Sequence, residues 1–163
     1  MAHSVTLKPN KSFRENARLL VPVLYDDFLA RKDRVVAHPK LKKDLHAMRI
    51  AGKTLRYAME VFEEGFGTEF SECLKEVKSL LELMGRVHDC DVNLPTLISH
   101  LDEMRAYNRV KSVDDRIATK SLLDLIRAQH QLRLSSYNEV SAAIQRWNES
   151  DFRSRMVQSM AAE

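Results

Sequence analysis

The chain is poor in the two residues that most often interrupt helices. Gly and Pro number only four each among 163 residues. Because these residues mark turns, a chain with so few of them is built from few, long elements. No run of alternating apolar and polar residues indicates strands, and no internal repeat or Ser/Gly linker divides the chain. The sequence therefore predicts one all-α domain over residues 1–163, a helical bundle with long antiparallel helices.

Cysteine and long apolar runs are also scarce. Cys73 and Cys90 are the only cysteines and lack the spacing of metal ligands, so neither a structural disulfide nor a metal centre is expected. No apolar run approaches the roughly eighteen residues of a membrane span. The N-terminal "MAHSVTLKPNKSF" has no apolar segment of the kind found in secretion signals. We therefore expect a cytoplasmic protein.

Charge of one sign does not dominate the chain. The formal net charge is +3 and the isoelectric point is near 8.9, which is too mildly basic to indicate a nucleic-acid partner from the overall balance. The sequence also has no glycine-rich phosphate loop and no serine nucleophile elbow. A non-enzymatic protein without a cofactor is therefore expected, and any anion site must come from local clusters of cations.

Apolar periodicity and the scattered turn residues predict six helices. Pro22 should kink the first of them. Asp91 should cap the fourth, with Pro95 in its first turn, and Ser150 should cap the last. The expected limits are about residues 10–35, 38–66, 69–88, 92–107, 114–147 and 150–160.

The second of these helices carries a row of basic residues beside its apolar face. Within "KKDLHAMRIAGKTLRYAMEVF" the row advances in steps of three, four and three residues. At about 100° per residue its members share one side of the helix, and only Glu60 has the same phase among the acids. Such a row repels itself and attracts phosphate groups. The row consists of His46, Arg49, Lys53 and Arg56, with Lys42 one turn earlier.

The apolar face of the same helix forms a separate broad arc at the same angular spacing. We predict that this arc enters the core. It consists of Leu41, Leu45, Met48, Ala51, Leu55, Ala58, Met59, Phe62 and Phe66.

Three other helices show shorter basic rows at the edges of their apolar faces. Any one row is what an ordinary solvated face would contain, but four rows together could line one groove for a long anion. These further rows are Lys11, Arg14 and Arg18; Lys75, Lys78 and Arg86; and Arg116, Lys120 and Arg127.

Two motifs resemble those of the CHAD domain, the conserved-histidine α-helical domain. "LHAMRIAGKTLRYAME" is similar to the family pattern H-x-x-R-x-x-x-K/R-x-x-R followed by "RY" and an acid. "LLELMGRVHDCDV" resembles the second hallmark, L-x-G-x-x-x-D-x-D-V, with Met84 before Gly85 and with Asp89 and Asp91 in the acidic positions. The resemblance extends over roughly residues 10 to 150.

The resemblance implies a helical bundle that binds inorganic polyphosphate through basic residues and has no catalysis of its own. It also implies polyphosphate-metabolising enzymes as partners and an association with polyphosphate granules. His46, Arg49, Lys53 and Arg56 match the ligand-contacting positions of the first motif. CHAD domains have two related helical halves, whereas this chain has one histidine motif and is closer to the C-terminal half.

Other interpretations of the same residues remain open. His46 with Arg49 at the third position after it is similar to a phosphoaccepting histidine, although histidine phosphotransfer domains favour Lys and Gly at the positions of Arg49 and Ile50. A basic row also attracts nucleic acid without sequence preference. "HDCD", residues 88–91, gathers metal-ligating types, but neighbours on a helix point apart, so Asp89 is expected to orient Lys78 or Arg86.

A second apolar row follows the polar side of the 38–66 helix. Ile50, Tyr57 and Val61 lie within about 40° of one another there. A helix with one buried face does not need a second apolar row, so another surface should cover it. That surface is either a helix of the same chain or a second copy, and a two-fold homodimer with both His46 rows facing one channel is expected.

Overall fold

The computed structural model describes residues 6–40 and 42–161, and every regular element in this part of the chain is a helix. The all-α prediction is therefore confirmed. Two short 3₁₀ turns, Glu63–Gly65 and Val113–Asp115, connect longer helices. The helices are α1 (Phe13–Leu29), α2 (Lys32–Ala37), α3 (Lys42–Phe62), α4 (Thr68–Arg109), α5 (Lys120–Glu149) and α6 (Phe152–Ser159).

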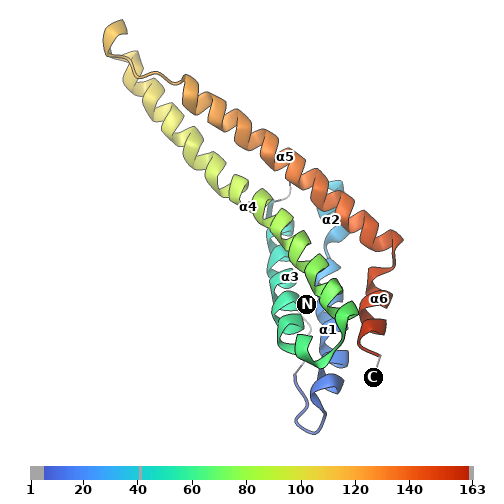
Figure 1. The fold of residues 1–163 in the computed structure, drawn as a ribbon. Coiled ribbons are helices and arrows are strands. Elements are labelled where there is room, and N and C mark those ends of the chain that lie inside the picture. Colours follow the sequence, from blue (N-terminus) through green and yellow to red (C-terminus); the bar gives the residue numbers. More distant parts are fainter. Residues whose placement is uncertain (1–5, 41, 162–163) are drawn as a thin grey trace.

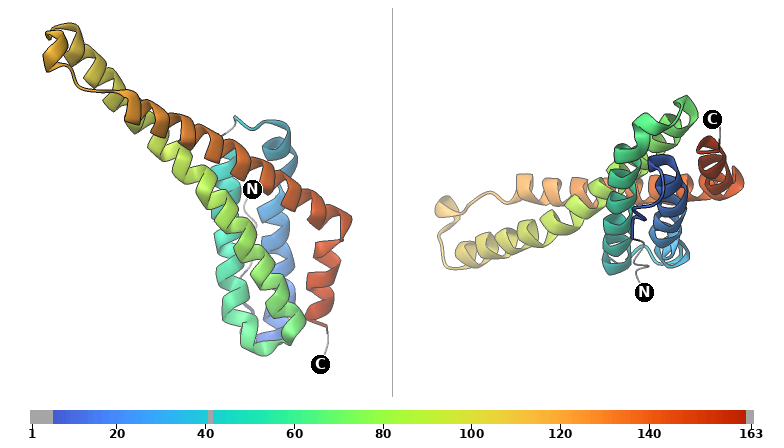
Figure 2. Two further views of the ribbon diagram at one scale, coloured as in Figure 1. Left: turned by 45° about the horizontal axis from the view of Figure 1, so that its top comes forward. Right: turned by 90° about the horizontal axis from the view of Figure 1, so that it is seen from below.

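The helices form a bundle from which a two-helix arm projects. α1, α3, α6 and the first half of α4 lie side by side in the bundle, and α5 crosses its upper end (Figure 1). The second half of α4 and the first half of α5 continue outward as an antiparallel pair, which Figure 2 shows from two further directions. We call residues 90–133 the arm. Helices α4 and α5 share the most extensive contact of any two elements among the described residues.

Two apolar cores follow from this shape. The bundle core buries large side chains of every helix, including Phe28, Phe70 and Phe152. The arm has a smaller core of its own, in which Leu94 and Leu101 pack against α5. Helix α4 contributes side chains to both cores and so connects them.

The apolar arc predicted for α3 lies in the bundle core. Gly52, in the middle of this face, allows α3 to approach its neighbours closely, because a Cβ atom there would lie 2.6 Å from Phe28 Cε2 and 2.7 Å from Leu81 Cδ2. Most of the arc is buried or half-buried, and its first member, Leu41, lies outside the described residues. The buried members are Leu45, Met48, Leu55, Met59 and Phe62, and the half-buried ones are Ala51, Ala58 and Phe66.

Several predicted helix boundaries are wrong. The third and fourth predicted helices are one continuous helix, α4, with Pro95 inside it. Packing along α5 therefore overrides the local preference of Asp91 and Pro95 for a helix start. The first predicted helix is instead divided into α1 and α2, with Pro22 inside α1.

The last two helices also begin later than predicted. α5 starts at Lys120, so Arg116 precedes it in the connection from the 3₁₀ turn. α6 is capped by Asp151 and not by Ser150, because the Asp151 carboxylate accepts a hydrogen bond from the Ser154 amide at 3.3 Å.

Both cysteines are buried free thiols, and burial raises the pKa of each. None of the helices that the structure describes is long and apolar enough to cross a membrane.

Candidate functional site

The basic row of α3 lies on the surface of the bundle, beside α4. His46 and Lys42 are exposed, and Arg49, Lys53 and Arg56 are half-buried along their length. His46, Arg49 and Lys53 form no ion pair with any residue in the described ranges 6–40 and 42–161. The sequence pattern therefore produces a row in which three consecutive positions keep their hydrogen-bond donors available.

A hollow of ≈ 320 Å³ opens between the start of α3 and the middle of α4. The rings of His46 and His88 stack across it, with their centroids 5.0 Å apart and their planes at 28°. Arg49 reaches over α4 next to Gly85, where a Cβ atom would lie 4.0 Å from Arg49 Nε. The hollow is lined by Lys42, Lys43, Leu45, His46, Arg49, His88, Asp91 and Val92.

Asp91 holds three segments together at the edge of this hollow. Its side chain is only 8% exposed and accepts hydrogen bonds from Arg133 Nε at 2.7 Å and Arg133 Nη2 at 3.3 Å. Lys42 Nζ lies 3.2 Å from the same carboxylate, and Arg133 also donates to the carbonyl of Pro39 at 3.0 Å. Asp91 is thus an ion-pair centre, and the predicted role as a helix cap is wrong.

A second contact joins α3 to α4 further along the row. Glu60 lies 3.0 Å from Lys78 Nζ and 3.7 Å from Arg56 Nε. The Arg56 guanidinium also lies over the ring of Tyr57, 4.5 Å from its centroid. Glu60 therefore brings Lys78 of α4 to the basic row and holds Arg56 in place. The cationic surface consists of the α3 row together with Lys43, Lys78 and His88, and we call it the α3–α4 site.

Residues 4–98 match the model of the CHAD domain. The chain belongs to the CHAD domain family. No curated protein and no solved structure matches the chain. CHAD domains are all-helical, are generally non-catalytic binding modules, and are associated with polyphosphate binding and metabolism.

The family match ends before the tip of α4, so the resemblance is shorter than the predicted span of residues 10 to 150. Both motifs, "LHAMRIAGKTLRYAME" and "LLELMGRVHDCDV", fall inside the matched part. The α3–α4 site of this CHAD domain also lies wholly within it. Most of the arm, together with α5 and α6, lies beyond it.

Apart from Lys78, the described members of the other predicted basic rows do not line the α3–α4 site of this CHAD domain. Arg14 and Arg18 donate to the carbonyls of Gly65 at 2.8 Å and Met160 at 2.7 Å, and so connect α1 to other parts of the bundle. Arg86 is directed toward α5, 3.9 Å from Glu139.

The α5 row is separated from the α3–α4 site because α4 runs on as one helix. The start of α5 therefore lies at the far end of the arm (Figure 1). Arg116 and Lys120 are exposed there, and Arg127 pairs with Asp124 at 3.0 Å. The prediction that four rows line one groove is therefore wrong.

The "HDCD" segment of this CHAD domain has roles other than those predicted. Asp89 is exposed, and the predicted partners Lys78 and Arg86 pair with glutamates instead. Within residues 6–40 and 42–161 no group of three or more His, Cys, Asp or Glu side chains could hold a metal ion.

Sequence reasoning missed Lys43 and His88 of the site, and it also missed Arg133, which holds Asp91 at the edge of the hollow. His88 was visible in "HDCD", but its partner His46 lies on another helix. Arg133 gave no local signal in the sequence, because its role depends on the packing of α5 against α4, which places it beside Asp91.

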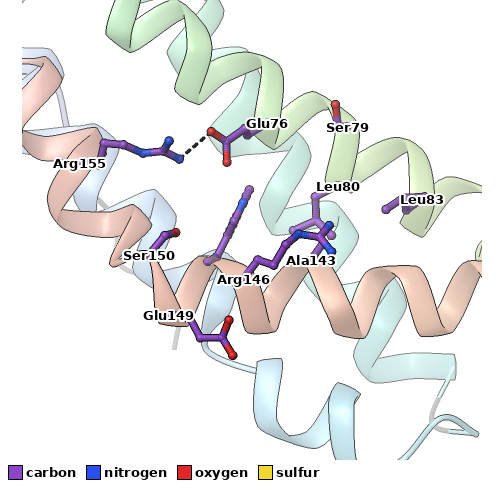
Figure 3. A pocket seen from close by; sticks show the side chains of 10 residues that line it. Glu76, Ser79, Leu80, Leu83, Ala143, Arg146, Glu149, Ser150 and Arg155 are labelled. Atoms are coloured by element: carbon purple, nitrogen blue, oxygen red, sulfur yellow. Dashed lines mark hydrogen bonds and ion pairs between the residues drawn. The ribbon is translucent and has the colours of Figure 1, made fainter.

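A larger hollow, of ≈ 620 Å³, lies on another side of this CHAD domain where α4, α5 and α6 meet (Figure 3). Arg155 in it pairs with Glu76 at 2.6 Å, and Arg146 and Glu149 line it from α5. Its two arginines and two glutamates balance in charge, so it has no preference for a polyanion. None of the predicted site residues lines it.

Proposed function

We propose that this CHAD domain is a non-catalytic module that binds inorganic polyphosphate at the α3–α4 site. The observation that carries the proposal is the row of α3, in which His46, Arg49 and Lys53 lack acidic partners among the described residues. The association of the family with polyphosphate supports the same ligand. Such a module would serve a cytoplasmic protein that binds to polyphosphate granules or to enzymes that make and degrade polyphosphate.

The shape of the row suits a chain better than a single phosphate. From Lys42 to Arg56 the helix rises by about 21 Å, at roughly 1.5 Å per residue. Arg49 and Arg56 can each grip phosphate oxygens with a planar guanidinium, and Lys53 between them adds a mobile charge. A linear polyanion lying along α3 would therefore contact several cations at once, whereas orthophosphate could reach only one or two.

Binding of long-chain polyphosphate should weaken steeply with salt. With about four phosphate contacts and roughly 0.7 counterions released per contact, the association constant should fall about 50-fold between 50 and 200 mM salt. Fluorescence anisotropy with labelled polyphosphate over a salt series measures this slope. Orthophosphate should compete poorly at equal phosphate concentration, and equal competition would contradict the chain-binding proposal.

The two alternative functions are distinguished in the same assay. Duplex DNA should compete weakly at physiological salt, and competition equal to that of polyphosphate would indicate a general polyanion binder. Incubation with a phosphorylated receiver domain should leave His46 without an acid-labile phosphate. Label on His46 would support phosphotransfer instead.

We also propose that the chain forms a homodimer through the outer row of α3. Ile50, Tyr57 and Val61 are 52%, 50% and 64% exposed, so no described helix of the same chain covers them. A two-fold partner would bury these side chains and place two His46 rows across one channel. Light scattering at micromolar concentration should give twice the 18.8 kDa of one chain. A monomer that still binds polyphosphate tightly would contradict this arrangement.

A further inference from the structure

His46 and His88 form a stacked pair in an electropositive hollow. The rings belong to α3 and α4, and their centroids are 5.0 Å apart. His46 is exposed and His88 half-buried, so both rings can be reached from solvent. Neither ring forms an ion pair with a residue in the described part of the chain. The pair is therefore accessible to a ligand that enters the hollow.

The charged groups around the pair are mostly cationic. From α3, Lys42, Lys43 and Arg49 line the same hollow. From α4 the hollow receives one carboxylate, Asp91, whose charge is already balanced by Arg133 of α5 and by Lys42.

Two further acids lie close in sequence but contribute little to the pair. Asp44, on the same helix as His46, pairs with Arg34 at 3.0 Å. Asp89 is exposed on α4 and does not line the hollow. Without a ligand the pair thus faces an excess of positive charge.

An anion that enters the hollow lies within a few ångströms of both rings, and opposite charge at that distance favours the charged form of an imidazole. An anion in the hollow reverses the sign of the local field. An imidazolium also offers two N–H donors and a positive charge to phosphate oxygens, where a neutral ring offers one donor and no charge.

We propose that His88 joins His46 in binding the phosphate chain and that the pair couples binding to proton uptake. This inference rests on the proposed function, because it concerns the same site. The bound state holds more protons than the free state, so the association constant rises as pH falls through the range in which imidazoles change charge. Lysine and arginine side chains ordinarily change charge far above this range and are therefore not the source of such a dependence.

The experiment compares polyphosphate binding at pH 6.0 and pH 8.0 at constant ionic strength. The dissociation constant of the unmodified chain should be at least about fivefold lower at pH 6.0, since net uptake of one proton changes affinity by up to roughly tenfold per pH unit. Calorimetry at pH 6.5 in two buffers of different ionisation enthalpy should show protons taken up on binding. Long-chain polyphosphate is used so that few of its groups are titratable chain ends.

Three variants assign the effect to the pair. His88→Gln should lose most of the pH dependence and bind more weakly at pH 6.0. His88→Lys, which carries a permanent charge, should bind tightly at both pH values. His130→Gln, on an exposed position of α5, removes a histidine outside the site and should behave as the unmodified chain does. Circular dichroism of each variant should show unchanged helix content.

The outcomes separate this inference from the proposed function. Polyphosphate binding that is equally tight at both pH values, or whose pH dependence persists in His88→Gln, would overturn the proton coupling alone. Absence of polyphosphate binding at every pH would overturn the proposed function itself. Loss of the pH dependence in His130→Gln as well would also overturn the assignment to His46 and His88.

Discussion

Replacing Arg49, Lys53 and Arg56 together by Ala should abolish retention on immobilised polyphosphate at physiological salt. Each charge-assisted contact contributes about 1 to 2 kcal/mol, so the three together account for roughly 3 to 6 kcal/mol, a loss of affinity of about 10² to 10⁴-fold. The helix should persist, because all three residues lie off the buried face of α3 and Ala favours the helix at least as well. Retention on a polyphosphate column and circular dichroism measure the two effects.

A charge-matched triple variant in the arm provides the control. Arg105, Arg109 and Lys111 are exposed and lie beyond the family match, so changing them to Ala removes the same net charge from a different place. This variant should bind polyphosphate nearly as well as the unmodified chain. Equal losses in the two triple variants would mean that overall charge, and not the α3–α4 site, determines retention.

Single replacements in the row should not be equivalent. Arg49 and Lys53 have no acidic partner among the described residues, whereas Arg56 is held near Glu60 and over Tyr57. Removing Arg56 would leave Glu60 paired with Lys78 alone, at 3.0 Å. Replacing Arg49 or Lys53 should therefore weaken polyphosphate binding more than replacing Arg56, because Arg56 is already engaged with a carboxylate.

Much of the fold could be predicted from the sequence because helical periodicity is a local property. The buried face of α3 follows from residues three and four apart, and the buried Leu45, Met48 and Leu55 lie where the spacing predicts. The same spacing placed the basic row at the edge of that face. Within one helix, therefore, the sequence was sufficient to predict which side chains face the core and which lie at its edge.

Relations between helices could not be predicted in this way. Asp91 and Pro95 carry local signals for a helix start, yet α4 continues through them while packed on α5. His88 sits among Asp and Cys in the sequence, but in the structure its ring meets His46 of another helix. Because α4 is continuous, it also carries the start of α5, and with it the α5 row, to the far end of the arm.

Asp91→Ala should destabilise the folded chain by about 3 kcal/mol, the cost of removing one partner from a largely buried ion pair. The Arg133 side chain is only 15% exposed and would lose its carboxylate, keeping the Pro39 carbonyl at 3.0 Å as its remaining partner. Lys42, at the start of the basic row, would lose the same anion. Urea denaturation followed by circular dichroism gives the free energy of unfolding.

Asp89→Ala is the matched control for this change, because Asp89 is the exposed acid of the same motif. Its free energy of unfolding should stay within about 0.5 kcal/mol of that of the unmodified chain, as is usual for surface positions. The double variant Asp91→Leu with Arg133→Leu should recover most of the lost stability, since an apolar pair of similar volume can replace a buried ion pair. If Asp91→Ala and Asp89→Ala had equal effects, the ion-pair centre would not be what holds α4, α5 and the start of α3 together.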